Sequence, residues 1–169
     1  MRLRAFTIAE LLVVIALVGV VLAIALPALD QTRQRAQTAG CAGNLRQIGL
    51  MIDRYQADHD HRLPALVNRD SINEPGPAID TLLRSPNDVD LFRCPSDASV
   101  AQRAGTSYFW NPAASGVTLD QLFPPKQHAP SLPLLADKQP FHRELRDGVN
   151  ILYADSHVPG QLYFTTPGK

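Results

Sequence analysis

The feature that most constrains the fold of this chain is the apolar run FTIAELLVVIALVGVVLAIALPAL, residues 6–29, in which Glu10 is the single charged residue. At about 1.5 Å per residue, a helix of this length reaches roughly 36 Å, whereas the hydrocarbon core of a bilayer is about 30 Å thick. The run is therefore predicted to cross a membrane. A cleaved signal peptide is the competing interpretation, but its apolar core would be shorter, and here the helical pattern continues past Ala23, Ala25 and Ala28.

The chain of 169 residues carries 16 basic and 16 acidic residues, so its net charge is zero and its composition does not favour nucleic acid as a partner.

The charges around the apolar run bear on its orientation in the membrane. Arg2 and Arg4 precede the run while Arg33 and Arg35 follow it, so their number does not decide the orientation. The free amino terminus adds a positive charge at the start, which predicts a cytoplasmic start and a head outside the cytoplasm.

Glu10 needs a physical reason to lie within the apolar run. A carboxylate in hydrocarbon costs a few kcal/mol on insertion scales. Either Glu10 lies close to the membrane interface, or it has a cationic partner. If the chain were cut between Ala5 and Phe6, the new ammonium group of Phe6 could pair with Glu10. The pair could form within one chain, or between neighbouring chains, where it would set the axial stagger of their helices.

The start of the chain, RAFTIAELLVVIALVGVVLAIALPAL, resembles the N-terminal signal of type IV prepilins and type II secretion pseudopilins. The resemblance implies that residues 1–5 are a leader, cut by a prepilin peptidase between Ala5 and Phe6, and that the new amine of Phe6 is methylated. It also implies that Glu10 recognises the Phe6 amine of another subunit during assembly and that Pro27 bends the helix. The residue before the cut is usually Gly in this family, and here it is Ala5.

The remainder of the chain is similar to the prepilin-like proteins of planctomycetes that carry a C-terminal His-x9-Asp-Gly signature. The stretches CAGNLRQIGLMIDRYQADHDHRLP, LFRCPSD, SYFWN and DGVNILYADSHV carry this resemblance. Asp155 matches the aspartate of the signature, but Ser156 stands in place of the glycine. The position expected for the histidine holds Leu145, and the nearest histidine is His142.

A periodic stripe predicts that the helix continues beyond the membrane. Apolar or small residues recur at steps of four and three residues, at Cys41, Leu45, Ile48, Ile52 and Tyr55. We therefore expect one long helix over residues 6–60, ending before Pro64, with its stripe covered by the C-terminal region. The predicted divisions are a leader (1–5), a transmembrane and assembly helix (6–29), its amphipathic continuation (30–62) and a globular head (63–169).

The head is predicted to be a small antiparallel sheet, which makes the fold class α+β and pilin-like. Prolines punctuate residues 61–105, where we expect loops and one short helix at 78–84. Strands are predicted at 107–111, 132–136, 149–154 and 161–165. The last two would form a hairpin with its turn at Asp155 and Ser156. The aromatic strand SYFWN has no interleaved basic residues, so it is expected in the sheet core rather than on a nucleic-acid surface.

Two cysteines, Cys41 and Cys94, supply all the thiols of the chain. If the head lies outside the cytoplasm, they can oxidise. A disulfide between them would close a loop of about 50 residues and stabilise the fold by roughly 4 kcal/mol in the chain-entropy model. The alternative is two buried free thiols.

The histidines and aspartates of the head raise the question of a metal or catalytic site. His142, Asp155 and His157, with Asp137, could converge at one end of the hairpin, but no HExxH, GxSxG or paired CxxC motif supports catalysis. We therefore predict no enzyme and no cofactor. Asp137, Asp147 and Asp155 are the weak candidates for calcium, which prefers several oxygen ligands, and the alternative is a set of solvated acidic turns.

These observations and the resemblance together predict a structural subunit, a pseudopilin of a type II secretion-like filament. The resemblance implies a single-pass protein of the bacterial inner membrane with a periplasmic head. Its implied partners are the prepilin peptidase, other pilin-like subunits and an inner-membrane assembly platform. The alternatives are a minor type IV pilin and a membrane-anchored extracytoplasmic binding module that does not polymerise.

Overall fold

The computed structural model describes residues 8–83, 90–122, 132–145 and 147–159. Helix α1 (Ile8–Asp58) contains the apolar run and its amphipathic continuation, as the sequence predicts. The chain divides into two compact units, residues 1–35 and 36–169, which are described separately. The predicted boundaries at residues 5, 29 and 62 stay a prediction, and the leader lies outside the described residues.

The described part of the first unit is an apolar helix whose side chains are almost all exposed. Aliphatic residues cover it, and the large ones among them, from Ile8 to Leu29, are between 48% and 80% exposed. In length and composition α1 is able to cross a membrane once, as a single-pass anchor does. The helix continues through Pro27. Because proline has no N–H, one backbone hydrogen bond is lost there, and the predicted bend at this residue stays a prediction.

In the second unit, one stripe of α1 is buried. Cys41, Leu45, Ile48 and Ile52 are at most 1% exposed, while Arg46 lies off the stripe and is exposed. The structure thus confirms the stripe that the sequence predicted. A β-carbon at Gly49 would lie 3.2 Å from Leu152 Cδ1, so the absence of a side chain lets the helix backbone approach the sheet closely.

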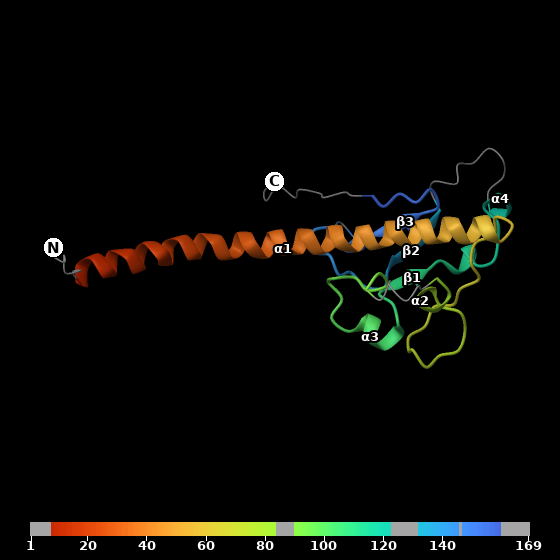
Figure 1. Cartoon of the computed structure of the whole chain (residues 1–169), viewed down its shortest axis with the longest axis horizontal. Helices are drawn as coiled ribbons and strands as arrows, with labels where there is room; N and C mark the ends of the chain where they lie inside the picture. The colour runs from red at the N-terminus through yellow and green to blue at the C-terminus, as the bar shows by residue number, and fades with distance from the viewer. Residues whose placement is uncertain (1–7, 84–89, 123–131, 146, 160–169) are drawn as a thin grey trace, which may run out of the picture. The chain divides into compact units, whose positions relative to one another are not determined.

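Three antiparallel strands form the sheet in the order β1-β2-β3, with β1 (Tyr108–Trp110), β2 (Pro133–Asp137) and β3 (Ile151–Tyr153) (Figure 1). In the register of β1 and β2, Tyr108 lies opposite Asp137 and Trp110 opposite Leu135. β1 and β3 fall within predicted ranges, and β2 ends one residue after its predicted range of 132–136. The predicted fourth strand at 161–165 lies outside the described residues.

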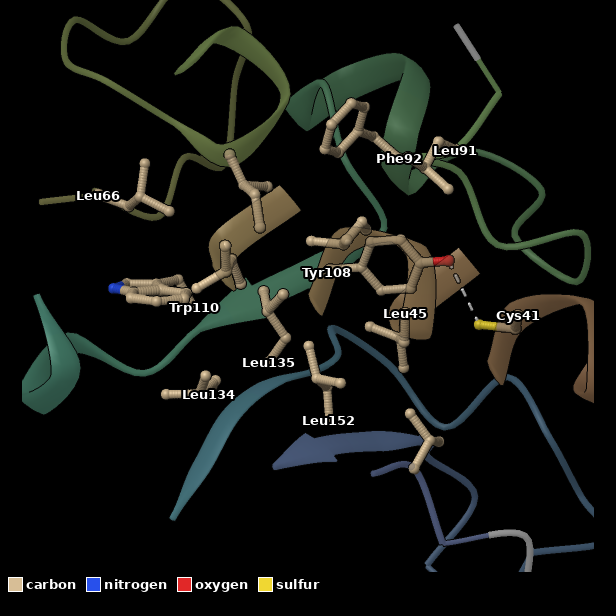
Figure 2. Packing of buried hydrophobic residues seen from close by; sticks show 14 of the residues in the cluster. Cys41, Leu45, Leu66, Leu91, Phe92, Tyr108, Trp110, Leu134, Leu135 and Leu152 are labelled. Atoms are coloured by element: carbon tan, nitrogen blue, oxygen red, sulfur yellow. Dashed lines mark hydrogen bonds between the residues drawn. The ribbon is translucent and has the colours of Figure 1, made fainter. Parts of the chain in front are cut away.

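Buried aromatic and aliphatic side chains join the sheet to the helix stripe (Figure 2). Tyr108 and Trp110 are each 1% exposed, whereas Phe109, on the other face of β1, is 44% exposed. Leu135 and Leu152 extend the same cluster from β2 and β3. The prediction that SYFWN contributes to the sheet core is therefore confirmed for two of its three aromatic residues.

Left-handed backbone conformations mark two predicted ends. Asp60 and His61 have φ of 52° and 58°, and they follow directly on the end of α1. After β3, the N–H of Ser156 donates to the carbonyl of Tyr153 at 2.9 Å, and Ser156 has φ of 61°. Ser156 thus occupies the turn position for which glycine is easiest, as the sequence predicted.

The prediction of one short helix between residues 61 and 105 is incomplete. Helix α2 (Ile79–Leu82) lies where it was expected, but α3 (Val100–Ala104) is a second helix in this range. Two further short elements, η1 (Pro112–Ala114) and α4 (Leu119–Leu122), were also not predicted. Such short helices carry too few residues to show a periodic apolar pattern, so they depend on contacts at their ends.

Asp97 supplies that end contact for α3. One carboxylate oxygen accepts hydrogen bonds from the backbone N–H groups of Ser99 at 2.8 Å and Val100 at 2.7 Å. The other accepts from Ala101 N–H at 2.7 Å and from the Ser107 hydroxyl at 2.5 Å. Burial raises the pKa of Asp97, but these hydrogen bonds outweigh it and hold the pKa below its ordinary value. The ionised carboxylate therefore stabilises this region.

We predict that Asp97→Ala lowers the free energy of unfolding of the full chain by about 1–2 kcal/mol at neutral pH, as for loss of a helix cap. Because the folded pKa of Asp97 is depressed, its contribution is fully present above the unfolded pKa of about 3.9 and is lost as the pH falls through the folded value. The difference between wild type and variant should therefore shrink below about pH 4. Denaturant unfolding in detergent at several pH values measures it.

Asp120→Ala is the matched control for this measurement. Asp120 is an exposed acidic residue in the first turn of α4, and its replacement should change stability by less than about 0.5 kcal/mol. Equal effects of the two substitutions would contradict the capping role of Asp97.

Candidate functional site

Glu10 lies in the first described turns of α1, within an exposed aliphatic surface. It is the single charged side chain among residues 8–29. A surface of this kind is stable in lipid or against other apolar helices, and a carboxylate on it is favourable where a cation comes close. The predicted cleavage and methylation positions, Ala5 and Phe6, lie outside the described residues.

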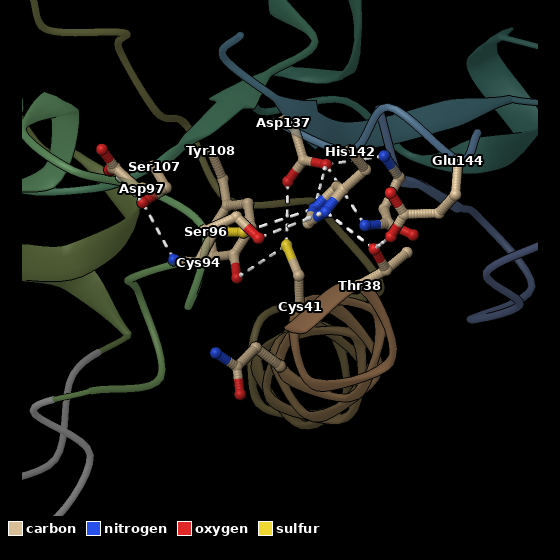
Figure 3. A network of polar contacts seen from close by, with 12 residues as sticks. Thr38, Cys41, Cys94, Ser96, Asp97, Ser107, Tyr108, Asp137, His142 and Glu144 are labelled. Carbon is tan, nitrogen blue, oxygen red and sulfur yellow. Dashed lines mark hydrogen bonds and ion pairs between the residues drawn. The ribbon is translucent and has the colours of Figure 1, made fainter. Parts of the chain in front are cut away.

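A second candidate site lies in the head, where four buried side chains gather. Cys41 comes from α1, Cys94 from the loop before α3, Asp137 from the end of β2, and His142 from the loop that follows. One ligand atom from each lies within 4.8 Å of the others. We call this group the buried tetrad. Figure 3 shows these side chains pointing toward one another above α1.

The contacts within the buried tetrad run from each sulfur to an oxygen or nitrogen atom. Cys41 Sγ donates to Asp137 Oδ1 at 3.0 Å, and Cys94 Sγ lies 3.4 Å from His142 Nε2. His142 Nε2 is also 3.4 Å from Asp137 Oδ2. The Cys41 sulfur further contacts the Tyr108 hydroxyl at 3.6 Å.

Burial and mutual contact shift the pKa values of the tetrad in different directions. The hydrogen bond with Cys94, burial and the charge of Asp137 all raise the pKa of Cys41, so its thiol keeps its proton. The same contact with Cys41 lowers the pKa of Cys94 to about 6, with help from His142 and against burial. Burial lowers the pKa of His142, but the hydrogen bonds to Asp137 and Cys94 outweigh it and raise the pKa to about 9.

Further hydrogen bonds orient the histidine of the tetrad. Thr38 Oγ1 lies 3.0 Å from His142 Nδ1, and the Thr38 hydroxyl donates to the Glu144 carboxylate. Because that hydroxyl hydrogen points to Glu144, Thr38 accepts the N–H of Nδ1. In neutral imidazole this tautomer leaves the lone pair on Nε2, which faces the other three ligand atoms.

Further hydrogen bonds also hold the aspartate of the tetrad. Asp137 Oδ2 accepts from the backbone N–H of Asn150 at 2.6 Å and from its side-chain amide at 3.3 Å. Oδ1 of the same carboxylate faces Cys41. Oδ1 thus faces Cys41, while Oδ2 faces both Asn150, just before β3, and His142 of the tetrad.

The cysteines that were predicted to form a disulfide are close together and are free thiols in this structure. Both are buried, and each contacts a different polar member of the tetrad. The disulfide between Cys41 and Cys94 therefore stays a prediction.

The candidate residues for calcium and catalysis are divided between the protein interior and its surface. Asp137 is buried with the two cysteines and His142, while Asp147 and Asp155 are exposed. Asp155 pairs with His157 on the surface, and His157 stacks on Tyr153. Within the described residues, the hydrogen bonds and ion pairs of the His142 side chain run to Thr38, Cys94, Ser96 and Asp137 and not to this surface pair.

The buried tetrad as a group was missed from the sequence. Cys41 was paired only with Cys94, and His142 was grouped with Asp155, His157 and Asp137. A usable signal existed for Cys41, which belongs to the apolar stripe and was expected near the core, whereas Asp137 was weighed as a calcium ligand or part of a solvated turn. His142 carried no such signal, because no periodic pattern surrounds it.

Comparisons with known proteins identify relatives of this chain by sequence. No family model matches the chain, and no solved structure does. The ComG operon protein 3 homolog of Bacillus licheniformis is 33% identical over 87 residues, which cover 52% of this chain and 86% of the relative. The competence protein ComGC of Halalkalibacterium halodurans is 30% identical over 71 residues, 42% of this chain and 67% of the relative. ComGC of Bacillus subtilis is 27% identical over 71 residues, 42% of this chain and 72% of the relative.

These alignments cover most of each relative and about half or less of this chain. The relatives are structural, pilin-like proteins rather than enzymes, in keeping with the long helix and small antiparallel sheet described above. The identity with them shows that this chain belongs to the ComGC family of pilin-like competence proteins.

Proposed function

We propose that the chain is a polymerising subunit of a type II secretion-like pseudopilus, processed between Ala5 and Phe6 and assembled through α1. The observation that carries this proposal is the exposed aliphatic surface of α1 from Ile8 to Leu29, which includes Glu10 as its one charged residue. Such a surface anchors the precursor in the bilayer. The same surface then packs against its copies in the core of a filament.

Pairing between chains explains why a carboxylate is retained at this depth. Cleavage after Ala5 would create the amine of Phe6 four positions before Glu10, and the amine, methylated or not, stays cationic. In an apolar filament core, an isolated charge of either sign is unfavourable, and a pair of opposite charges is far less so. The contact of Glu10 with the Phe6 amine of a neighbouring subunit would also set the axial stagger of the helices.

The proposed surroundings of the subunit follow from its anchor. A prepilin peptidase would process it, and an inner-membrane assembly platform would add it to other pilin-like subunits. The amino terminus would face the cytoplasm, and the head would lie in the periplasm or its equivalent outside the membrane. The head itself would be of the type found in the His-x9-Asp-Gly group of prepilin-like proteins, which it resembles in sequence.

The names of the relatives favour a second candidate function, in which the chain is a subunit of a competence-type assembly and not of a secretion machine. Two of them are named competence proteins, and the third is named after the ComG operon. A minor type IV pilin would use the same helix in the same way. An anchored binding module that never polymerises is the alternative in which Glu10 would have no role in assembly.

We predict that Glu10→Ala leaves membrane insertion and leader cleavage largely intact but abolishes assembly. The substitution keeps the helix apolar and removes the one group that would meet a neighbour's amine. The measurement is the amount of subunit in sheared, sedimented filaments, compared with the amount of processed subunit in the membrane fraction.

Asp30→Asn is the matched control for this experiment, because Asp30 is the next acidic residue of α1 and lies just beyond the apolar run. It should assemble as wild type does. Normal filament levels of Glu10→Ala would refute the pairing, and the anchored-module alternative would then apply.

The proposed processing also predicts the identity of the mature amino terminus. Protein isolated from filaments should begin at Phe6 with a methylated amine, and its mass should lack residues 1–5. N-terminal sequencing and intact-mass measurement decide this. A filament subunit that begins at Met1 would leave no amine near Glu10 and would contradict the proposed assembly.

A further inference from the structure

The buried tetrad combines two sulfur, one nitrogen and one oxygen donor in a part of the head that the proposed assembly does not use. We propose that Cys41, Cys94, Asp137 and His142 bind one Zn²⁺ ion in a tetrahedral site. All four side chains are buried, and they come from one helix, one strand end and two loops. The ion would therefore link α1 to the sheet and to both loops of the head.

Two of the distances within the tetrad fit this coordination, and the third is slightly short. Zinc binds sulfur at about 2.3 Å and nitrogen or oxygen at about 2.0–2.2 Å, so neighbouring ligand atoms of a tetrahedral site lie roughly 3.3–3.8 Å apart. Cys94 Sγ–His142 Nε2 and His142 Nε2–Asp137 Oδ2 are both 3.4 Å, whereas Cys41 Sγ lies 3.0 Å from the other carboxylate oxygen, Oδ1. With every ligand atom within 4.8 Å of the others, small side-chain movements complete the site.

The directions of the two polar side chains distinguish a metal site from a site built for a disulfide. A disulfide between Cys41 and Cys94 would use neither Asp137 nor His142. Here one carboxylate oxygen faces one sulfur, and Nε2 faces the other sulfur as well as the carboxylate. The two sulfurs, Nε2 and the carboxylate thus converge on one another, which is the arrangement that a bound cation requires.

Neighbouring residues hold the two polar ligands as they are held in zinc sites. Metal-bound histidines usually donate their other ring N–H to an oxygen, and ligating carboxylates usually accept further hydrogen bonds. His142 does this through the Thr38 hydroxyl, which in turn donates to Glu144. Asp137 does it through the backbone and side chain of Asn150. Thr38 is therefore a positioning residue for the site.

The donor set selects the kind of metal. Calcium and magnesium prefer oxygen ligands, whereas two thiolates with an imidazole and a carboxylate suit zinc. On binding, the ion would displace the thiol proton of Cys41 and any proton on Cys94 Sγ or His142 Nε2, and these protons leave to solvent. No electron is transferred in this step, and no oxidant is needed.

The test uses the full-length chain in detergent, reduced with a phosphine and freed of metal before titration with Zn²⁺. We expect one equivalent of zinc to bind, and Co²⁺ at the same site to show thiolate-to-cobalt charge-transfer bands and the d–d bands of tetrahedral coordination. Cys94→Ser should lose these charge-transfer bands in part and bind zinc far more weakly. Thr38→Val should weaken binding by about ten- to hundred-fold, as loss of an outer-shell partner does.

Two comparisons make this test specific. His157→Ala removes an exposed imidazole that also pairs with an aspartate, and it should bind zinc as wild type does. Thr38→Ser keeps the hydroxyl and should restore the affinity that Thr38→Val loses. Far-ultraviolet circular dichroism shows whether Cys94→Ser folds. If it does not fold, the comparison of Thr38→Val with Thr38→Ser still tests the zinc site, because both variants keep all four ligands.

Three results would overturn the proposal. The first is uptake of less than one equivalent of zinc by the reduced chain. The second is binding of zinc by Thr38→Val as tight as that by Thr38→Ser. The third is a chain isolated from native membranes without reductant that contains a disulfide between Cys41 and Cys94 and no zinc. That result would instead support the disulfide predicted from the sequence.

Discussion

The contact between the helix stripe and the sheet is the interaction on which the rest of the head depends. Leu45, Ile48 and Ile52 are almost completely buried, and Gly49 lets the backbone of α1 lie against Leu152 of β3. A stripe of this kind is unfavourable in water, so it needs a cover, and a small sheet of three short strands needs an apolar face packed against another element. The head therefore folds around one face of α1, while the aliphatic surface from Ile8 to Leu29 stays exposed for lipid or for other helices.

Polar groups in the two units are retained for different physical reasons. In the head, Asp137 and His142 are buried beside two sulfurs, and each has hydrogen bonds that account for its orientation. In the membrane helix, Glu10 lies on an apolar surface whose natural environment is lipid or another helix. Both cases follow the rule that a charge is kept in an apolar place where a partner of opposite charge can approach it. The proposed partners are a zinc ion for the tetrad and a neighbour's amine for Glu10.

Local patterns predicted most of the fold, and long-range contacts account for what they missed. The stripe from Cys41 to Ile52 has a helical period, and an aromatic run, a short apolar run and an alternating segment mark the three strands, so these elements follow from neighbouring residues alone. Ser156 was also predicted, because a tight turn needs positive φ at that position. Helix α3 depends on Asp97, which lies outside it. The tetrad depends on tertiary packing that brings Cys41 next to His142, and no local pattern encodes that approach.

The central claim is that the carboxylate of Glu10 meets the Phe6 amine of a neighbouring subunit, and zero-length coupling tests it most directly. A carbodiimide joins a carboxylate to an amine only where the two are in contact. Filaments assembled from a mixture of ¹⁴N- and ¹⁵N-labelled subunits should yield a Phe6–Glu10 cross-linked peptide of mixed isotope composition by mass spectrometry. A cross-link found only within single-isotope chains, or none in intact filaments, would contradict the account.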